Sequence, residues 1–314
     1  MNDNPSIVYN GEHAQANVNA GSGSMTVNNN YMHVRSFEEA SSGLRSWYNC
    51  AFADKHFERV ESKKILEWIS TPIRDNNPSN RVSLLVGDAG TGKSVIMREL
   101  LETLEGNGTK VLGLKSDLLF ANNSDLDKAV GFNKPVASEI ADIADQQQVV
   151  LLVDQIDALS STLSSSRTPL LSINALVDAV SRHHNVRVVV SCRPYDWQYD
   201  PALERYKHGN IIHIQGLPIE NVEETLASAN IRIDKNEDEV KQFLTNPLNL
   251  FLFCRIKNGS VFNSQRPNRT LLFEALWKQI VVDGVTDTEM VSENGVTTFL
   301  DSISSEMYKK QTLA

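Results

Sequence analysis

The chain has 314 residues, of which 41% are hydrophobic and 22% are charged. These shares are typical of an ordinary globular protein and exclude a wholly disordered or collagen-like chain. The 30 basic and 39 acidic residues give a net charge of −9, so no global positive field attracts the chain to nucleic acid or to anionic lipid. We therefore expect neither general nucleic-acid binding nor attachment to a membrane.

The cysteines and the start of the chain indicate the compartment. Cys50, Cys192 and Cys254 are far apart and odd in number, which fits neither a disulfide framework nor a zinc site. The first residues lack a basic region followed by an apolar run, so they predict no secretion signal. We expect a cytoplasmic protein. Cys192 should be a small buried residue rather than a nucleophile, because no partner base lies near it in the sequence.

The first two segments differ in composition. Residues 1–33 are rich in Asn, Gly and Ser and nearly uncharged, so they predict a flexible tail. The alternating runs SIVYN and SMTVN would also suit short strands that pair with another copy or another domain. Residues 34–79 predict a helical lead-in that packs beside the next domain. The apolar residues that should line one side of its helix are Phe57, Val60, Ile65, Trp68 and Ile69.

Residues 80–218 alternate short apolar runs with helical stretches. The runs VSLLV, KVLGL, VVLLV, VRVVVS and NIIHIQ read as strands. This rhythm predicts an α/β fold in which helices cover both faces of a parallel sheet.

The end of the chain is helical. Residues 219–268 predict a small helical domain, and residues 269–314 hold two further apolar-periodic helices. These two helices should expose an apolar side that another segment or a second copy covers. The chain stops at Ala314 directly after a helical run, which is compatible both with a truncated protein and with a natural end. The side comprises Leu272, Leu276, Ile280, Phe299, Ile303 and Met307.

A glycine-rich run lies between the first predicted strand and a helix. It reads Gly87, Asp88, Ala89, Gly90, Thr91, Gly92, Lys93 and Ser94, with Val95 next. Glycines let backbone N–H groups and a helix N-terminus approach a phosphate closely. Lys93 should reach the outer phosphates and Ser94 should ligate Mg²⁺. The nine residues from Gly87 to Val95 are thus predicted to bind ATP or ADP with Mg²⁺.

Two acidic residues follow the predicted strand VVLLV. Asp154 ends that strand, and acids at the carboxyl edge of a parallel sheet can hold the metal of a bound nucleotide. We therefore assign Asp154 to Mg²⁺ together with Ser94. Asp157 lies three residues further on and could orient or deprotonate the attacking water. Its alternative role is that of a helix N-cap.

An arginine follows the next predicted strand. Arg193 stands in the run Ser191-Cys192-Arg193-Pro194, and its fork-shaped guanidinium suits the γ-phosphate of ATP. It could therefore distinguish ATP from ADP. We assign Lys93, Asp157 and Arg193 to catalysis; the alternative for Arg193 is a plain surface residue.

The loop and the two strand ends together resemble the nucleotide-binding module of the STAND NTPases, a class of P-loop NTPases, and in particular its NACHT-like bacterial branch. The likeness covers roughly residues 57–310. Residues 246–250 resemble the family's proline-leucine motif, which implies that Pro247 packs on adenine; a proline that merely opens a helix is the alternative. The resemblance also implies that residues 269–314 begin a winged-helix domain. The histidine that usually grips ADP there has no counterpart, since none occurs after His213.

Three functions are compatible with these motifs. The resemblance implies a slowly hydrolysing switch that forms a homo-oligomer on activation, answers a protein trigger or drives an effector, and serves in bacterial antiviral defence. A conventional AAA+ ATPase working on DNA or protein is the second reading. A nucleotide-dependent scaffold that never hydrolyses is the third. No second arginine motif of the AAA+ kind is recognisable after the predicted sheet.

Overall fold

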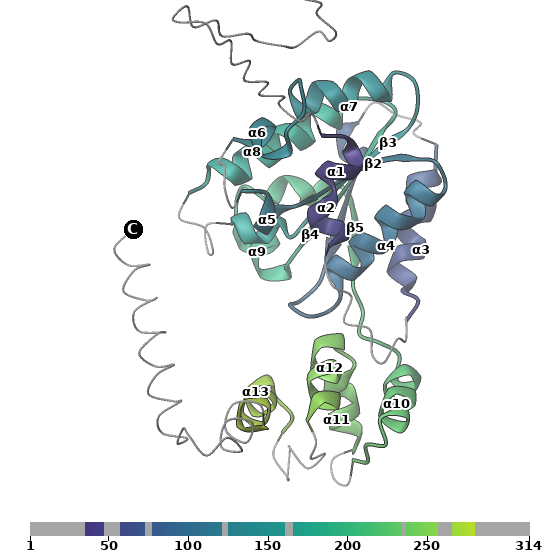
Figure 1. The fold of residues 1–314 in the computed structure, drawn as a ribbon, viewed down its shortest axis with the longest axis vertical. Coiled ribbons are helices and arrows are strands. Elements are labelled where there is room, and N and C mark those ends of the chain that lie inside the picture. The colour runs from purple at the N-terminus through teal and green to yellow at the C-terminus, as the bar shows by residue number, and fades with distance from the viewer. Residues whose placement is uncertain are drawn as a thin grey trace, which may run out of the picture.

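The central element of the fold is one parallel sheet (Figure 1). The computed structural model describes residues 35–46, 57–72, 77–120, 125–160, 166–233, 237–256 and 266–279. Within them the strand order is β2-β3-β4-β1-β5. The strands are β1 (Val82–Val86), β2 (Lys110–Lys115), β3 (Val149–Asp154), β4 (Val186–Cys192) and β5 (Asn210–His213). The predicted α/β fold with a parallel sheet is confirmed.

Helices cover both faces of the sheet, which explains the continuous apolar runs of its strands. In β3, for example, Leu151 faces one apolar core and Leu152 the other, and both are fully buried. One face carries α2 (Ser42–Arg45), α3 (Val60–Ser70) and α4 (Lys93–Gly106). The other face carries α6 (Leu126–Val130), α7 (Val136–Ala144) and α8 (Thr168–Val180).

Short elements complete this part of the chain. They are α1 (Phe37–Ala40), α5 (Ser116–Leu119), α9 (Pro194–Tyr199), and the 3-10 turns η1 (Pro78–Arg81), η2 (Ile156–Leu159) and η3 (Glu204–His208). In the lead-in segment Ile65 and Ile69 are buried against the α4 side of the sheet. Val60, predicted to share their face, is instead 62% exposed, because it is the first residue of α3.

Four helices form a second group beside the sheet domain (Figure 1). They are α10 (Ile219–Ser228), α11 (Glu237–Leu244), α12 (Pro247–Arg255) and α13 (Arg269–Trp277), and we call them the helical domain. Val222, Leu244, Phe253 and Leu272 are buried in its own apolar cluster. Because α13 packs into this cluster, the predicted boundary at residue 269 does not divide two cores in the described part of the chain.

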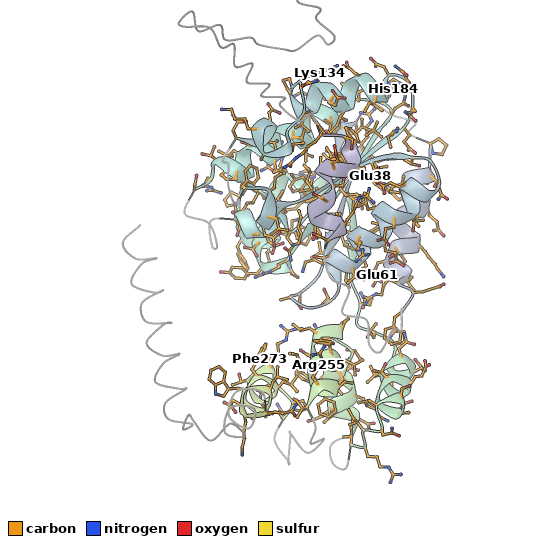
Figure 2. The ribbon with its side chains drawn as sticks, viewed as in Figure 1. Glu38, Glu61, Lys134, His184, Arg255 and Phe273 are labelled. Atoms are coloured by element: carbon orange, nitrogen blue, oxygen red, sulfur yellow. The ribbon has the colours of Figure 1, made fainter. Side chains whose placement is uncertain are left out.

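The predicted apolar side of the terminal helices is wrong for α13. Leu272 is fully buried and Leu276 packs against the helical-domain cluster, because α13 turns this face toward α12. The large apolar side chains that α13 does expose are Trp277 and Phe273, the second of which is labelled on this helix in Figure 2. The predicted members Ile280, Phe299, Ile303 and Met307, like the strand-forming runs in residues 1–33, lie outside the described residues. Among the described helices none is long and apolar enough to cross a membrane.

Candidate nucleotide-binding site

The glycine-rich loop connects β1 to α4. Gly90 and Gly92 have φ angles of +81° and +96°, in the left-handed region that favours glycine. Gly92 is the N-cap of the 14-residue helix α4, whose first amides carry the positive end of the helix dipole. The Gly87 amide donates to the Cys192 carbonyl at 3.2 Å, which joins the loop to the end of β4. The loop therefore has the backbone geometry of a phosphate-binding loop.

Lys93 is folded onto this loop. Its side chain is nearly buried, and Nζ donates to the carbonyl oxygens of Gly87 at 2.6 Å and Asp88 at 3.0 Å. Burial lowers the pKa of Lys93, while the nearby carboxylates of Asp157 and Asp154 oppose that effect. A phosphate group bound at the loop would place a negative charge beside this ammonium group and stabilise its protonated form.

Asp154 is fully buried at the end of β3. Its Oδ1 accepts a hydrogen bond from Ser191 Oγ at 2.6 Å. The Ser191 hydroxyl oxygen in turn accepts a hydrogen bond from the Gln155 amide at 2.8 Å. Burial raises the pKa of Asp154, and the Ser191 and Ser94 hydroxyls and the Lys115 ammonium oppose the rise. Ser191 thus positions both Asp154 and the residue after it, a role that the sequence did not reveal.

The same carboxylate fits a metal ion. Asp154 Oδ2 has no hydrogen-bond partner at normal distance among the described residues, and Ser94 belongs to the same site, in the first turn of α4. A carboxylate and a hydroxyl are oxygen donors of the kind that Mg²⁺ binds together with phosphate. These two residues could therefore hold the Mg²⁺ of a nucleotide.

A buried lysine from the next strand completes this side of the site. Lys115 Nζ donates to Gln155 Oε1 at 2.6 Å and to both carboxylate oxygens of Asp117 at 2.8 and 2.9 Å. It also lies 4.0 Å from Asp154 Oδ2. The sequence analysis missed Lys115, although the parallel register that pairs Lys115 with Asp154 could have revealed it. Gln155 is held between these partners with a φ of +57°.

Asp157 and Arg193 form an ion pair. Arg193 Nε lies 2.8 Å from Asp157 Oδ2, and the Asp157 side chain is buried whereas that of Arg193 is 42% exposed. Burial raises the pKa of Asp157, and Lys93 and Arg193 oppose the rise. The alternative of a helix N-cap is not supported, because Asp157 lies inside η2, whose N-cap is Gln155. Arg193 contacts the proposed base itself here, which the sequence did not predict.

The helical domain reaches the phosphate loop through α12. Asn246 caps this helix by accepting from the amides of Leu248 and Asn249, and Pro247 occupies its first turn. The Leu248 amide donates to the Gly90 carbonyl at 3.1 Å, and Asn246 Nδ2 donates to the Ala89 carbonyl at 3.3 Å. Pro247 thus opens α12 beside the loop, and its predicted contact with adenine stays a prediction.

Gly90 is also required by this docking. A Cβ atom added at Gly90 would lie 2.5 Å from Leu248 Cβ, closer than two carbons can approach. The glycine therefore serves the approach of α12 as well as the left-handed turn.

An arginine on α13 adds a third contact. Arg269 Nη2 donates to the Ala89 carbonyl at 2.7 Å, and Nε donates to Asn249 Oδ1 at 2.9 Å. The sequence analysis did not recognise this residue, because 180 positions separate it from Ala89. No local sequence pattern predicts a contact between residues so far apart in the chain.

Two remaining observations concern the role of Cys192 and the search for clusters of metal ligands. Cys192 is fully buried, and burial raises the pKa of its thiol far above the usual range. The prediction that it is a small core residue is confirmed. In the described part of the chain no group of three or more His, Cys, Asp or Glu residues is arranged to hold a metal ion.

Ser191→Ala should destabilise the protein by about 2 kcal/mol, because it removes the hydrogen bonds of a buried carboxylate oxygen and of the part-buried Gln155 amide. Denaturation in urea measures this change. Ser116→Ala is the matched control: Ser116 is equally buried, but its Oγ makes no hydrogen bond with described residues. An equal cost for the two variants would contradict the positioning role of Ser191.

Several solved structures give partial matches to this chain, all with TM-scores below 0.5. Domain III of the replication initiation protein DnaA from Thermotoga maritima matches with a TM-score of 0.44 and 13% identity, covering 74% of this chain and 97% of that chain. AMPPCP-bound DnaA from Aquifex aeolicus gives 0.43 and 15%, covering 84% and 94%. PCH-2 from C. elegans gives 0.38 and 16%, covering 70% and 68%. No curated protein sequence matches.

Residues 83–215 match the sequence profile of the family described as "ATPase family associated with various cellular activities (AAA)". The matched range begins in β1, ends two residues after β5, and includes the phosphate loop, Asp154, Asp157 and Arg193.

Proposed function

We propose that this chain, whose residues 83–215 match the AAA ATPase family, is a slowly hydrolysing ATP-dependent switch that assembles into a homo-oligomer on activation. One observation carries the proposal. Three donors of the helical domain, from Asn246, Leu248 and Arg269, bind two consecutive carbonyls of the phosphate loop. The conformation of that loop and the position of the helical domain are therefore mechanically linked, as a switch requires.

Each residue of the site has its own role in the proposed reaction. The loop amides and Lys93 would bind the phosphates, and Ser94 and Asp154 would hold Mg²⁺, which neutralises phosphate charge when bound. Asp157 would take a proton from the attacking water through its buried Oδ1, which has no partner among the described residues. Arg193 would leave Asp157 Oδ2 for the γ-phosphate when ATP binds, so that the ion pair is kept in one nucleotide state and broken in the other.

We also assign the chain to the NACHT-like STAND branch, and this finer assignment rests on the motif resemblance alone. It includes a role in bacterial antiviral defence, a cytoplasmic location, and a protein trigger or effector. Its support is the set of residues in the loop and in the strand ends at Asp154 and Arg193, together with the Pro247 segment on α12.

A working AAA+ ATPase that acts on DNA or protein is the second candidate. The contact of Arg269 with the loop favours it, because this arginine would approach a phosphate bound there. A non-hydrolysing scaffold is the third, and the buried Oδ1 of Asp157, which has no hydrogen-bond partner in the described part of the chain, counts against it.

Turnover kinetics separate these candidates. For the switch we expect one fast round of ATP hydrolysis followed by slow steady-state turnover, with ADP retained through gel filtration. A working ATPase would turn over continuously and release ADP, and a scaffold would retain intact ATP. Either result would contradict the proposed switch.

A further inference from the structure

The lead-in segment from residue 57 to residue 70 contacts both domains. Its Phe57 side chain packs against the apolar cluster of the helical domain, whereas Ile65 and Ile69 are buried in the core of the sheet domain. Ser62 Oγ donates to Glu99 Oε2 on α4 at 2.6 Å. The segment is therefore fixed to the sheet domain at one end and touches the helical domain at the other.

Two charged residues lie between these anchors. Arg59 and Glu61 are 8% and 5% exposed, and Arg59 Nε lies 3.3 Å from Glu61 Oε2. Burying two charges is costly unless additional hydrogen bonds satisfy them. The hydrogen-bond partners of Arg59 and Glu61 therefore indicate the role of this buried pair.

Those partners belong to the connection between the two domains. Gln215 stands after β5 and before α10, so it lies in the linker from the sheet domain to the helical domain. Its amide donates to Glu61 Oε1 at 2.7 Å, and its carbonyl accepts from Arg59 Nη2 at 2.7 Å. The pair thus binds both backbone groups of one linker residue, as a neighbouring strand would. Figure 2 places Glu61 at the end of the sheet domain nearest the helical domain.

Arg59 also faces the nucleotide site. A Cβ atom built at Gly92 would lie 3.8 Å from Arg59 Nη1, so the guanidinium lies against the last glycine of the phosphate loop. One side chain therefore binds the interdomain linker and lies beside the phosphate loop.

We propose that Arg59 and Glu61 form a clamp on Gln215 that holds the helical domain against the phosphate loop and so retains the nucleotide. The proposal rests on the proposed function, because retention matters only if the chain binds nucleotide. Opening of the switch would then require the clamp to release Gln215.

The test compares two double variants. In Arg59→Met/Glu61→Leu, apolar side chains of similar volume replace the buried pair, an exchange that often preserves stability. In the control Glu58→Gln/Lys63→Met, an exposed ion pair of the same segment is removed; its atoms are 2.6 Å apart and its side chains 75% and 64% exposed. Hydrogen exchange at the Gln215 amide and the release rate of a fluorescent ADP analogue are measured for both.

We expect the clamp variant to lose protection at the Gln215 amide and to release ADP roughly tenfold faster or more, as the loss of charge-assisted hydrogen bonds implies. The control should match the unaltered chain in both measurements. Unchanged ADP release in a folded clamp variant with an unprotected Gln215 amide would overturn the proposal. If the double variant does not fold, Glu61→Leu, which removes the acceptor of the Gln215 amide and leaves Arg59 bound to the Gln215 carbonyl, replaces it under the same criterion.

If the unaltered chain binds no nucleotide, the proposed function fails and the clamp is judged separately by small-angle X-ray scattering. A larger radius of gyration in the clamp variant than in the control would support a clamp that holds the two domains together. Identical scattering curves would overturn it.

Discussion

Lys93→Ala should abolish measurable nucleotide binding, weakening ATP affinity by roughly a hundredfold or more, because charge-assisted contacts to phosphate are lost. In the structure the ammonium group donates to the carbonyls of Gly87 and Asp88 within its own loop. Its removal therefore takes away the cation that offsets phosphate charge without removing an apolar core residue. Isothermal titration calorimetry with Mg²⁺-ATP measures the effect.

Lys110→Ala serves as the control, because this exposed lysine begins β2 at the opposite end of the sheet. It should bind ATP like the unaltered chain, and thermal unfolding should show that both variants are folded. Tight ATP binding by a folded Lys93→Ala variant would contradict the assignment of the loop.

Asp157→Asn should bind ATP almost normally and hydrolyse it roughly 100- to 10,000-fold more slowly, the usual contribution of a general base. Single-turnover hydrolysis measures this loss independently of product release. The control is Asp178→Asn, which removes an exposed carboxylate from α8. Normal hydrolysis by Asp157→Asn would show that Asp157 only anchors Arg193.

The pH dependence of hydrolysis tests the same pair. Asp157 can accept a proton only when it is ionised, so hydrolysis should fall as the pH drops through its pKa. Arg193 opposes the rise of that pKa caused by burial. Arg193→Ala should therefore raise this pKa further in the enzyme without ATP, where the ion pair is intact, and move the acidic limb of the kcat/KM profile, which reports that state, to higher pH. A limb that stays in place, or that moves to lower pH, would contradict a catalytic role for the ionised carboxylate.

The sequence was sufficient where an assignment depends on neighbours along the chain. The strand VVLLVD reads directly as a buried strand, because its apolar side chains have no polar alternation. The loop from Gly87 to Ser94 lies between strand and helix as its pattern predicts. Cys192 is buried, as expected for a cysteine with no partner base near it in the sequence.

The contacts that unite the site could not be read in this way. Lys115 meets Gln155 because two strands lie side by side in a particular register. Arg269 meets Ala89 because the helical domain folds back onto the loop. Such pairings depend on tertiary packing, and no local period encodes them.

The prediction of which side of α13 is exposed failed for a related reason. Leu272 and Leu276 repeat with a helical period, so the sequence identifies one apolar side of the helix but not what covers it. In the structure α12 covers that side, and Phe273 and Trp277 become the exposed apolar residues.

Light scattering of the chain at several concentrations, with either ADP or a non-hydrolysable ATP analogue, tests the central claim most directly. If the phosphate loop and the helical domain act as one switch, self-association should be stronger with the ATP analogue than with ADP. Arg193→Ala should reduce this difference. The same oligomeric state with both nucleotides, whether monomeric or associated, would contradict a nucleotide-controlled switch.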